Sequence, residues 1–417
     1  MRTALSGLTT RGRCLLAAGM TLGVCAVLLG QRDLLRAAVF LTGLPLVAVL
    51  IVSRTRYRLS CTRQLDPPRV EVGRPSTVRL RLDNVSRLPS GVLLMEDALP
   101  FVLGGRPRFV LDRVEPRGVR EVSYPVRSEV RGRFRVGPLS VRLTDPFGLV
   151  ELTRSFSSAD DLVVTPLVSP LPGVRLGGDW SSGGEAVSRA VSATGSDDAA
   201  TREYREGDDL RKVHWRSTAR VGELMVRREE QPFTSRCTLL LDARATGHRG
   251  QGPGSSLEWA VSAVASVGVA LVRSGYALRL LGDTGVDLVP SAVPLTEGTL
   301  LDALAGVTPS PRATLEGAID QLRRTGVEGV LVAVLGALEA DDVEQLARLR
   351  NGTAACVAVL VDTPTWAGSR GTPTHDAAVS LLRRSGWRVL EVAHGTTLAT
   401  VWPEAGIRSS RALEVGT

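Results

Sequence analysis

The stretch "CTLLLDARAT", residues 237–246, places a short apolar run directly before an aspartate. Beyond it, apolar runs such as "GVLVAVLG" and "AACVAVLVD" alternate with longer segments of helical spacing such as "EADDVEQLARLR". Continuous apolar strands separated by helices are typical of a parallel sheet that is covered by helices on both faces. We therefore predict an α/β domain with a doubly wound parallel sheet over residues 233–417.

Ligands of doubly wound sheets usually bind beyond the carboxyl ends of the strands, which makes "DARAT", residues 242–246, the first place to look for a site. No GxGxxG follows this strand and no GxxxxGK[ST] occurs in the chain, so neither motif supports nucleotide binding. The five cysteines show no CxxC spacing, so neither a disulfide framework nor a zinc site is indicated. The sequence thus gives no sign of a cofactor.

An aspartate at the end of the first strand resembles the von Willebrand factor A fold, whose ion site uses DxSxS with a distant Thr and a distant Asp. Asp242 matches the first element, but Arg244 and Thr246 stand in the two serine places, and "VLGALEA" has no aspartate where that family would place one. A hard cation needs several oxygen ligands, and a guanidinium would repel it. We therefore expect a degenerate ion site without a bound metal, in which Arg244 pairs with Asp242.

Two uncharged apolar runs, residues 14–29 and 37–52, lie near the start of the chain. Each covers about 24 Å as a helix, and arginines at the ends can extend toward the surface of a ~30 Å hydrocarbon core. We predict a two-helix transmembrane hairpin over residues 1–58, in contact with membrane lipid. Arginine is more frequent outside the runs than between them, so both termini and the soluble domains are expected in the cytoplasm, with the hairpin in the inner membrane.

After residue 58 the spacing of apolar residues changes to two. Val78, Leu80 and Leu82 alternate with Thr77, Arg79 and Arg81, as in a half-buried strand. Further short runs separated by Gly, Pro and Asn predict an antiparallel β-sandwich of about seven strands, Ig-like in size, over residues 59–168. Residues 169–200 are rich in Gly, Ser and Ala and are expected to form a linker.

The segment 201–232 contains "REYREGDDLRKVHWRSTAR", in which arginines and carboxylates surround a histidine and a tryptophan. Basic neighbours would keep the carboxylates ionised, which disfavours acid–base catalysis by His214 and Asp208. The net charge of +8 is compatible with nucleic-acid binding, but the interleaved acids would repel phosphate. We favour an interdomain joint in which Trp215 is buried, with no nucleic acid bound.

The same segment resembles the signature of the bacterial domain of unknown function 58 family, and "RGRFRVGPLSVRLTDPFGLV", residues 131–150, is similar to a second stretch of that family. The matching residues are Arg202, Tyr204, Gly207, Asp208, Arg211, Trp215, Ala219 and Arg220. The resemblance implies a non-enzymatic scaffold or adaptor that works with a MoxR-type AAA+ ATPase in protein assembly or maturation. The alternatives are a hydrolase with a site around His214 and Asp208, and a metal-dependent protein-binding module.

The arginine distribution predicts the orientation of the hairpin. A reporter that is active only outside the cytoplasm should stay silent when it is fused after Ser169. The control is the same reporter fused between the two apolar runs, after Gln31, where it should be active. A strong signal after Ser169 would invert the orientation and exclude cytoplasmic ATPases as partners.

Overall fold

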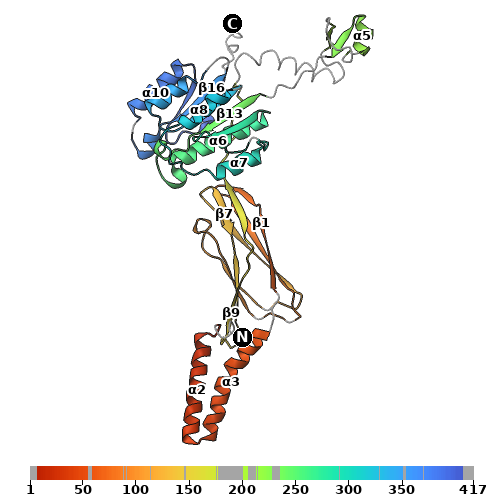
Figure 1. Cartoon of the computed structure of the whole chain (residues 1–417), viewed down its shortest axis with the longest axis vertical. Coiled ribbons are helices and arrows are strands. Elements are labelled where there is room, and N and C mark those ends of the chain that lie inside the picture. Colours follow the sequence, from red (N-terminus) through yellow and green to blue (C-terminus); the bar gives the residue numbers. More distant parts are fainter. Residues whose placement is uncertain are drawn as a thin grey trace, which may run out of the picture. The chain divides into compact units, whose positions relative to one another are not determined.

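The computed structural model of the chain divides into two compact units, residues 1–165 and 166–417, which are drawn in Figure 1. The structure describes residues 7–54, 59–174, 176, 201–204, 213, 215–227 and 235–406, apart from residues 88, 91, 113, 145, 146, 291, 328, 351–353 and 370. Each unit has its own hydrophobic core.

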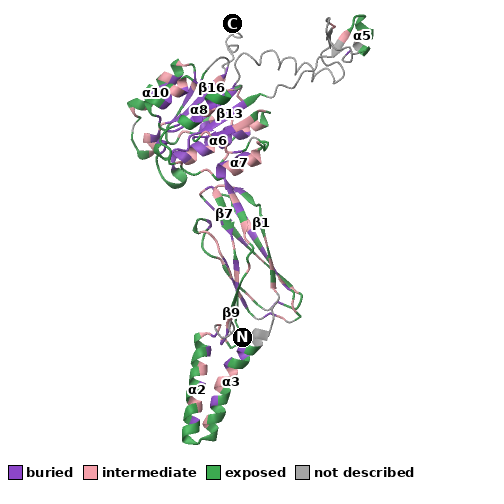
Figure 2. Ribbon diagram, viewed as in Figure 1, coloured by how far each residue is buried: buried purple, intermediate pink, exposed green. Residues whose placement is uncertain are grey.

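The first unit begins with two antiparallel helices, α2 (Thr10–Leu29) and α3 (Arg32–Arg54), which run side by side (Figure 1). Both are long and apolar enough to span a membrane, as predicted. Gly19 allows their close approach, because a Cβ atom there would collide with the side chain of Thr42. Much of the hairpin surface is exposed (Figure 2), including Val27 at 75%, Leu28 at 80% and Phe40 at 68%, and a bilayer would cover such apolar side chains.

The rest of the first unit is built of short strands in three sheets with the orders β1-β3-β6, β2-β10-β7 and β5-β4-β8-β9. All pairs in these sheets are antiparallel except β10 with β2, which is parallel and was not predicted. The strands are β1 (Leu59–Asp66), β2 (Arg69–Glu71), β3 (Pro75–Asn84), β4 (Leu93–Asp97), β5 (Arg108–Leu111), β6 (Val119–Arg127), β7 (Gly132–Val136), β8 (Leu139–Thr144), β9 (Glu151–Ser155) and β10 (Asp160–Thr165).

The two-residue alternation predicted for residues 77–82 is confirmed. Val78, Leu80 and Leu82 of β3 are at most 1% exposed and belong to the core of the β-rich part. One charged pair is also buried there: Arg63 Nη2 lies 2.7 Å from Asp97 Oδ1, and the Tyr124 hydroxyl donates to Asp97 Oδ2 at 2.5 Å. Burial and the neighbouring carboxylate raise the pKa of Tyr124, so the phenol stays protonated. These contacts satisfy a buried carboxylate and have a structural role.

The second unit contains a five-stranded parallel sheet with the order β14-β13-β15-β16-β17. Its strands are β13 (Arg236–Leu241), β14 (Ala277–Gly282), β15 (Val330–Leu335), β16 (Ala355–Val361) and β17 (Arg388–Val392). In chain order this is 2-1-3-4-5, a common order of doubly wound sheets.

Helices cover both faces of this sheet, so the prediction of a doubly wound α/β domain is confirmed. Leu239 and Leu241 of β13 pack in one cluster with α6 (Ser256–Arg273) and α7 (Glu297–Ala305). Leu240 packs in the other cluster with α8 (Glu316–Thr325), α9 (Ala340–Ala347) and α10 (Pro373–Arg384). Helix α6 is also long and apolar enough to cross a membrane, but 67% of it is buried, so it is a core helix. A short helix, α11 (Leu398–Val401), follows β17.

The linker predicted for residues 169–200 begins with residues that pack in the α/β unit, and residues 166–168, assigned to the β-sandwich, belong to the same unit. Ser169 N donates to Ser266 Oγ of α6 at 2.9 Å, and Ser262 Oγ donates to the carbonyl of Leu167 at 2.6 Å. Leu176 is fully buried in the cluster around α6, and Leu171 and Val174 pack against it. Residues 166–174 and 176 therefore belong to the α/β unit, because their apolar side chains pack in the cluster around α6.

Candidate functional site

The candidate site lies at the carboxyl end of β13, where Asp242 follows the strand. β13 has β14 on one side and β15 on the other, so the order of the strands reverses between β13 and β15. In doubly wound sheets this reversal is where ligands bind, because the loops after the two strands diverge there. Asp242 and Arg244 are both buried at this position, at 0% and 1% exposure.

The carboxylate of Asp242 has four hydrogen bonds. Its Oδ1 accepts from Arg244 N at 3.1 Å and Arg244 Nε at 2.9 Å. Its Oδ2 accepts from Arg244 Nη2 at 2.9 Å and from Gly336 N, just after β15, at 3.1 Å. An ionised carboxylate has about four acceptor positions, so none of them remains for a metal ion.

The guanidinium of Arg244 uses all five of its N–H groups. Besides the two bonds to Asp242, Nη1 donates to Asp342 Oδ2 at 2.8 Å and to Ala313 O at 3.0 Å, and Nη2 donates to Ala337 O at 3.0 Å. Burial alone would lower the pKa of Arg244, but the hydrogen bonds and charges of Asp242 and Asp342 outweigh it and raise the pKa. Arg244 is therefore a permanent cation held between two carboxylates.

Asp342 completes the network from the first turn of α9. It is 2% exposed, and its Oδ1 accepts from Leu315 N, at the start of α8, at 3.1 Å. The side chains of Asp242, Arg244 and Asp342, here called the Arg244 network, thus join the end of β13, the start of α8 and the β15–α9 loop.

His248 lies beside this network but has no free nitrogen. Its Nε2 is 2.9 Å from the carbonyl oxygen of Asp242, and its Nδ1 is 3.0 Å from Ser256 Oγ. The carbonyl can only accept, so Nε2 carries the proton, and Ser256 Oγ, which accepts from Arg249 N at 2.9 Å, donates to Nδ1. Burial is the main cause that lowers the pKa of His248. This neutral, fully bonded imidazole has no lone pair with which to act as a general base.

The prediction that Arg244 pairs with Asp242 is confirmed, whereas Thr246 is exposed and takes no part in the network. Asp342 was not among the predicted site residues. The signal for it was its spacing: Asp342 lies four residues from both Leu338 and Leu346, on the apolar side of α9, where an acid needs a partner. Among the described residues, no cluster of three or more His, Cys, Asp or Glu side chains could hold a metal ion.

The segment of the family signature contains β11 (Thr201–Glu203), α5 (Trp215–Val221) and β12 (Met225–Arg227). β11 and β12 are antiparallel, with Arg202 of β11 opposite Val226, and Tyr204 N donates to Leu224 O at 2.8 Å. Ala219 and Arg220 are exposed on α5. Gly207, Asp208, Arg211 and His214 lie outside the described residues.

Trp215 is 71% exposed, so the expected burial of this residue is wrong for the described structure. The physical reason is the length of α5. The expectation assumed a helix from Asp209 with two covered sides, but α5 begins at Trp215 and has seven residues. The role of the segment as an interdomain joint stays a prediction.

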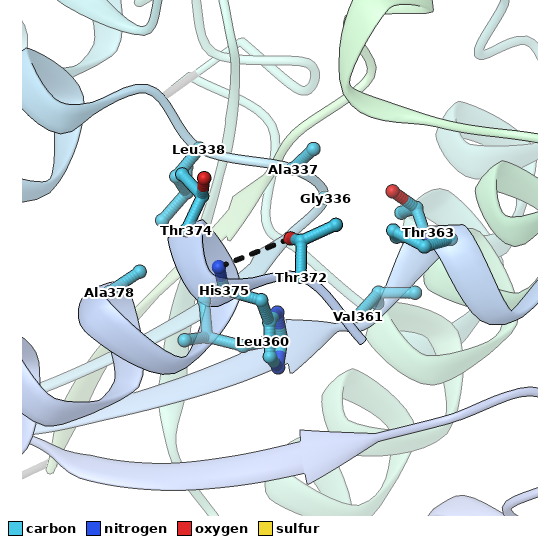
Figure 3. A pocket seen from close by; sticks show the side chains of 11 residues that line it. Gly336, Ala337, Leu338, Leu360, Val361, Thr363, Thr372, Thr374, His375 and Ala378 are labelled. Atoms are coloured by element: carbon cyan, nitrogen blue, oxygen red, sulfur yellow. Dashed lines mark hydrogen bonds between the residues drawn. The ribbon is translucent and has the colours of Figure 1, made fainter. Parts of the chain in front are cut away.

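A small cavity of about 60 Å³ lies beyond the ends of β15 and β16, near the start of α10 (Figure 3). Its polar side chains are Thr363, Thr372, Thr374 and His375, and Thr372 Oγ1 accepts from His375 N at 3.4 Å. These side chains include no pair of a nucleophile and an adjacent base, and the volume suits a few water molecules. The cavity therefore does not indicate a catalytic site.

The Arg244 network predicts that Asp342→Ala greatly lowers the stability of the α/β unit. Removal of one carboxylate leaves the buried guanidinium partly unpaired, which should lower the free energy of unfolding by about 3 to 5 kcal/mol. Urea unfolding of the full chain in detergent would measure this, since all six tryptophans lie in the second unit. The control Asp341→Ala removes the exposed neighbouring carboxylate and should cost less than about 1 kcal/mol. Equal effects of the two substitutions would contradict the network.

The same geometry predicts how the chain responds to divalent ions. Calorimetry with Mg²⁺ or Mn²⁺ should show no binding to the wild type, because Arg244 occupies the acceptor positions of Asp242. Arg244→Ser removes the cation from between two carboxylates and should raise Mn²⁺ affinity at least tenfold, whereas Arg249→Ser, an exposed control, should not. Micromolar wild-type affinity that is lost in Asp242→Ala would show an active ion site.

Comparisons with known proteins bear on the family of the chain. Residues 200–366 match the family model described as "Protein of unknown function DUF58". The uncharacterized protein YeaD of Bacillus subtilis (strain 168) is 24% identical over 245 residues, which cover 57% of this chain and 58% of that protein. The chain thus matches little more than half of this relative's length.

Solved structures give weaker matches. The CARDB domain of the PF1109 protein from Pyrococcus furiosus is 11% identical, and the match covers 26% of this chain and 90% of that one with a TM-score of 0.20. The ASH/PapD-like domain of human CEP192 is 13% identical, with 26% and 85% covered and a TM-score of 0.18. With TM-scores this low, these matches support no conclusion about the fold or a ligand of this chain. Residues 200–366 are thus similar to the family of proteins of unknown function DUF58, and the distant similarity to YeaD agrees with the resemblance that the sequence indicates.

Proposed function

We propose that the chain is a membrane-anchored, non-enzymatic adaptor that works with a MoxR-type AAA+ ATPase in the assembly or maturation of other proteins. The observation that carries the proposal is the exposure of Trp215, a residue of the family signature, on the surface of α5. The two apolar N-terminal helices supply the membrane anchor. The orientation remains the one that the arginines predict, with the soluble units in the cytoplasm.

The Arg244 network argues against a catalytic site at the end of β13. Catalysis in doubly wound sheets needs side chains with unused donors or acceptors at the carboxyl edge. At the end of β13, the side chains of Asp242 and Arg244 have no unused donor or acceptor, because they bond to each other, to Asp342 and to the backbone. The network also disfavours the metal-dependent binding module, because the cation place holds a guanidinium.

We extend the proposal to the folds of the β-rich part and of the α/β unit. We regard the α/β unit as a von Willebrand factor A-like domain with a degenerate ion site, since an aspartate ends the first strand of a parallel sheet. We regard the β-rich part as an Ig-like sandwich, since its antiparallel strands enclose one apolar core. Both descriptions suit a protein that binds other proteins.

Trp215 is suited to a protein contact. Exposed tryptophans often dominate the binding energy of interfaces, because a large apolar ring also carries an N–H donor. Val221 at 58% and Leu224 at 41% are exposed apolar residues of the same segment. Arg216 and Arg220, which are also exposed on α5, provide charged groups for the rim of an interface.

Binding measurements with the full chain in nanodiscs and a MoxR-type ATPase from the same genome test the proposal. Trp215→Ala should weaken binding at least tenfold, as removal of an interface hot spot does, while the urea midpoint of the chain stays unchanged because the side chain is exposed. The control is Val286→Ala, which truncates another apolar residue of the second unit at 64% exposure and should leave binding unchanged.

Two results would contradict the adaptor. Equal binding of Trp215→Ala and wild type would remove Trp215 from the interface. Turnover of an ester or peptide substrate that is lost in His214→Ala would favour the hydrolase instead.

A further inference from the structure

The turn between β8 and β9, residues 147–150, is joined directly to the start of the membrane hairpin. Leu8 and Val150 form an antiparallel bridge, in which Thr9 N donates to Leu149 O at 2.9 Å and Glu151 N donates to Gly7 O at 2.8 Å. Thr9 Oγ1 also donates to the carbonyl of Gly148 at 2.7 Å. Residues 7–9 thus act as an additional short strand beside the turn.

The turn packs at one end of the hairpin, beside the start of α2 and the last apolar residues of α3. Leu149 and Val150, at 3% and 1% exposure, form a cluster with Leu8 and with Ala48 and Val49 of α3. The apolar run of α3 continues to residue 52. The β8–β9 turn therefore lies beside the last few residues of this run. Gly12, in the first turn of α2, allows this contact, since a Cβ atom there would collide with the carbonyl of Leu149.

The exposed side chains at this level have the composition of a membrane interface. Phe147 of the turn is 64% exposed, and Leu46, Val47 and Leu50 of α3, next to the buried Ala48 and Val49, are exposed by 48%, 52% and 47%. The exposed apolar surface of the helix therefore continues at the level of the turn. Phe147 lies two residues before Leu149, which packs against this part of α3, so a bilayer that covers the helix surface would extend close to Phe147.

Polar groups lie beside the turn, as in the headgroup region. The guanidinium of Arg11 lies 3.9 Å from the position that a Cβ atom of Gly148 would take, and Arg11 and Arg13 are both exposed. A polar hollow of about 400 Å³ beside the turn is lined by Gly7, Leu8, Thr9, Thr10, Glu151 and Thr153. Aromatic residues and arginines with long apolar stems favour the boundary between acyl chains and headgroups.

We propose that the β8–β9 turn is a third membrane contact, in which Phe147 inserts at the boundary between the acyl chains and the headgroups of the lipid bilayer. This inference rests on the membrane anchoring of the proposed function. A protein partner is the other class of occupant, but the continuity of the turn with the exposed apolar surface of α3 favours lipid. The contact would attach the β-rich part to the bilayer by its own residues in addition to the two helices.

The test is tryptophan fluorescence of the full chain in nanodiscs whose lipids carry bromine near the headgroup end of the acyl chains. The native tryptophans all lie beyond residue 165, so wild type supplies a constant background. The added signal of Phe147→Trp should be quenched at least twofold, and that of Phe101→Trp, a control in the β-rich part at 95% exposure, should not change. Phe40→Trp, within the apolar run of α3, should be quenched and reports insertion of the hairpin.

The outcomes separate this inference from the membrane anchor. Quenching at position 40 without quenching at position 147 overturns the turn contact and leaves the anchor. A blue-shifted but unquenched signal at position 147 indicates a protein occupant and also overturns it. Absence of quenching at both positions overturns the anchor together with the inference.

A second variant tests how the turn is held. Gly12→Ala in the Phe147→Trp background should reduce the quenching by at least half, because the added methyl group displaces the carbonyl of Leu149. The matched control is Gly43→Ala, where the methyl group meets no atom within 4 Å, and it should leave the quenching unchanged. Unchanged quenching in Gly12→Ala would contradict the role of the hairpin contact in placing Phe147.

Discussion

The α/β unit depends on one interaction, the burial of a single arginine between two carboxylates. Asp242 and Asp342 come from elements about a hundred residues apart, and each would be costly to bury with its charge unpaired. Arg244 forms an ion pair with each carboxylate, and the backbone N–H groups of Gly336 and Leu315 stabilise the remaining negative charge. Backbone carbonyls satisfy the remaining N–H donors of Arg244. The place where this kind of sheet usually binds ligands is consequently part of the core.

The geometric effect of the Arg244 network is clearer than its net contribution to stability. Buried ion pairs often contribute no more than apolar side chains of the same size would, but loss of one member leaves a buried charge. Because the five donors of Arg244 point in fixed directions, they determine where the β15–α9 loop and the start of α8 lie relative to β13. The network thus fixes the part of the carboxyl edge that lies between β13 and β15.

Local patterns predicted the elements of the fold well. The apolar runs of β13, β15 and β16 and the two-residue alternation of β3 reflect burial on one or two faces, which is visible in the sequence.

The pair of Arg244 with Asp242 was also predictable, because the two residues are near neighbours. Asp342 was not, since its contact with Arg244 spans 98 residues and depends on how α9 is placed by the core. The parallel pairing of β2 with β10 and the packing of Leu176 near α6 are long-range contacts of the same kind. The prediction that Trp215 is buried was wrong. It assumed a helix that starts at Asp209, whereas α5 starts at Trp215.

Long-range contacts also decide how the first unit is attached to its hairpin. The bond from Thr9 to Leu149 closes a chain segment of 140 residues, and such closure is entropically unfavourable unless several contacts form together. Here the backbone bridge, the cluster around Val150 and the glycine at position 12 act at the same point. A link through α3 alone would leave the β-rich part freer to tilt relative to the hairpin. The additional contact at residues 147–150 restricts that tilt, because a body attached at separate points along its chain has fewer orientations open to it.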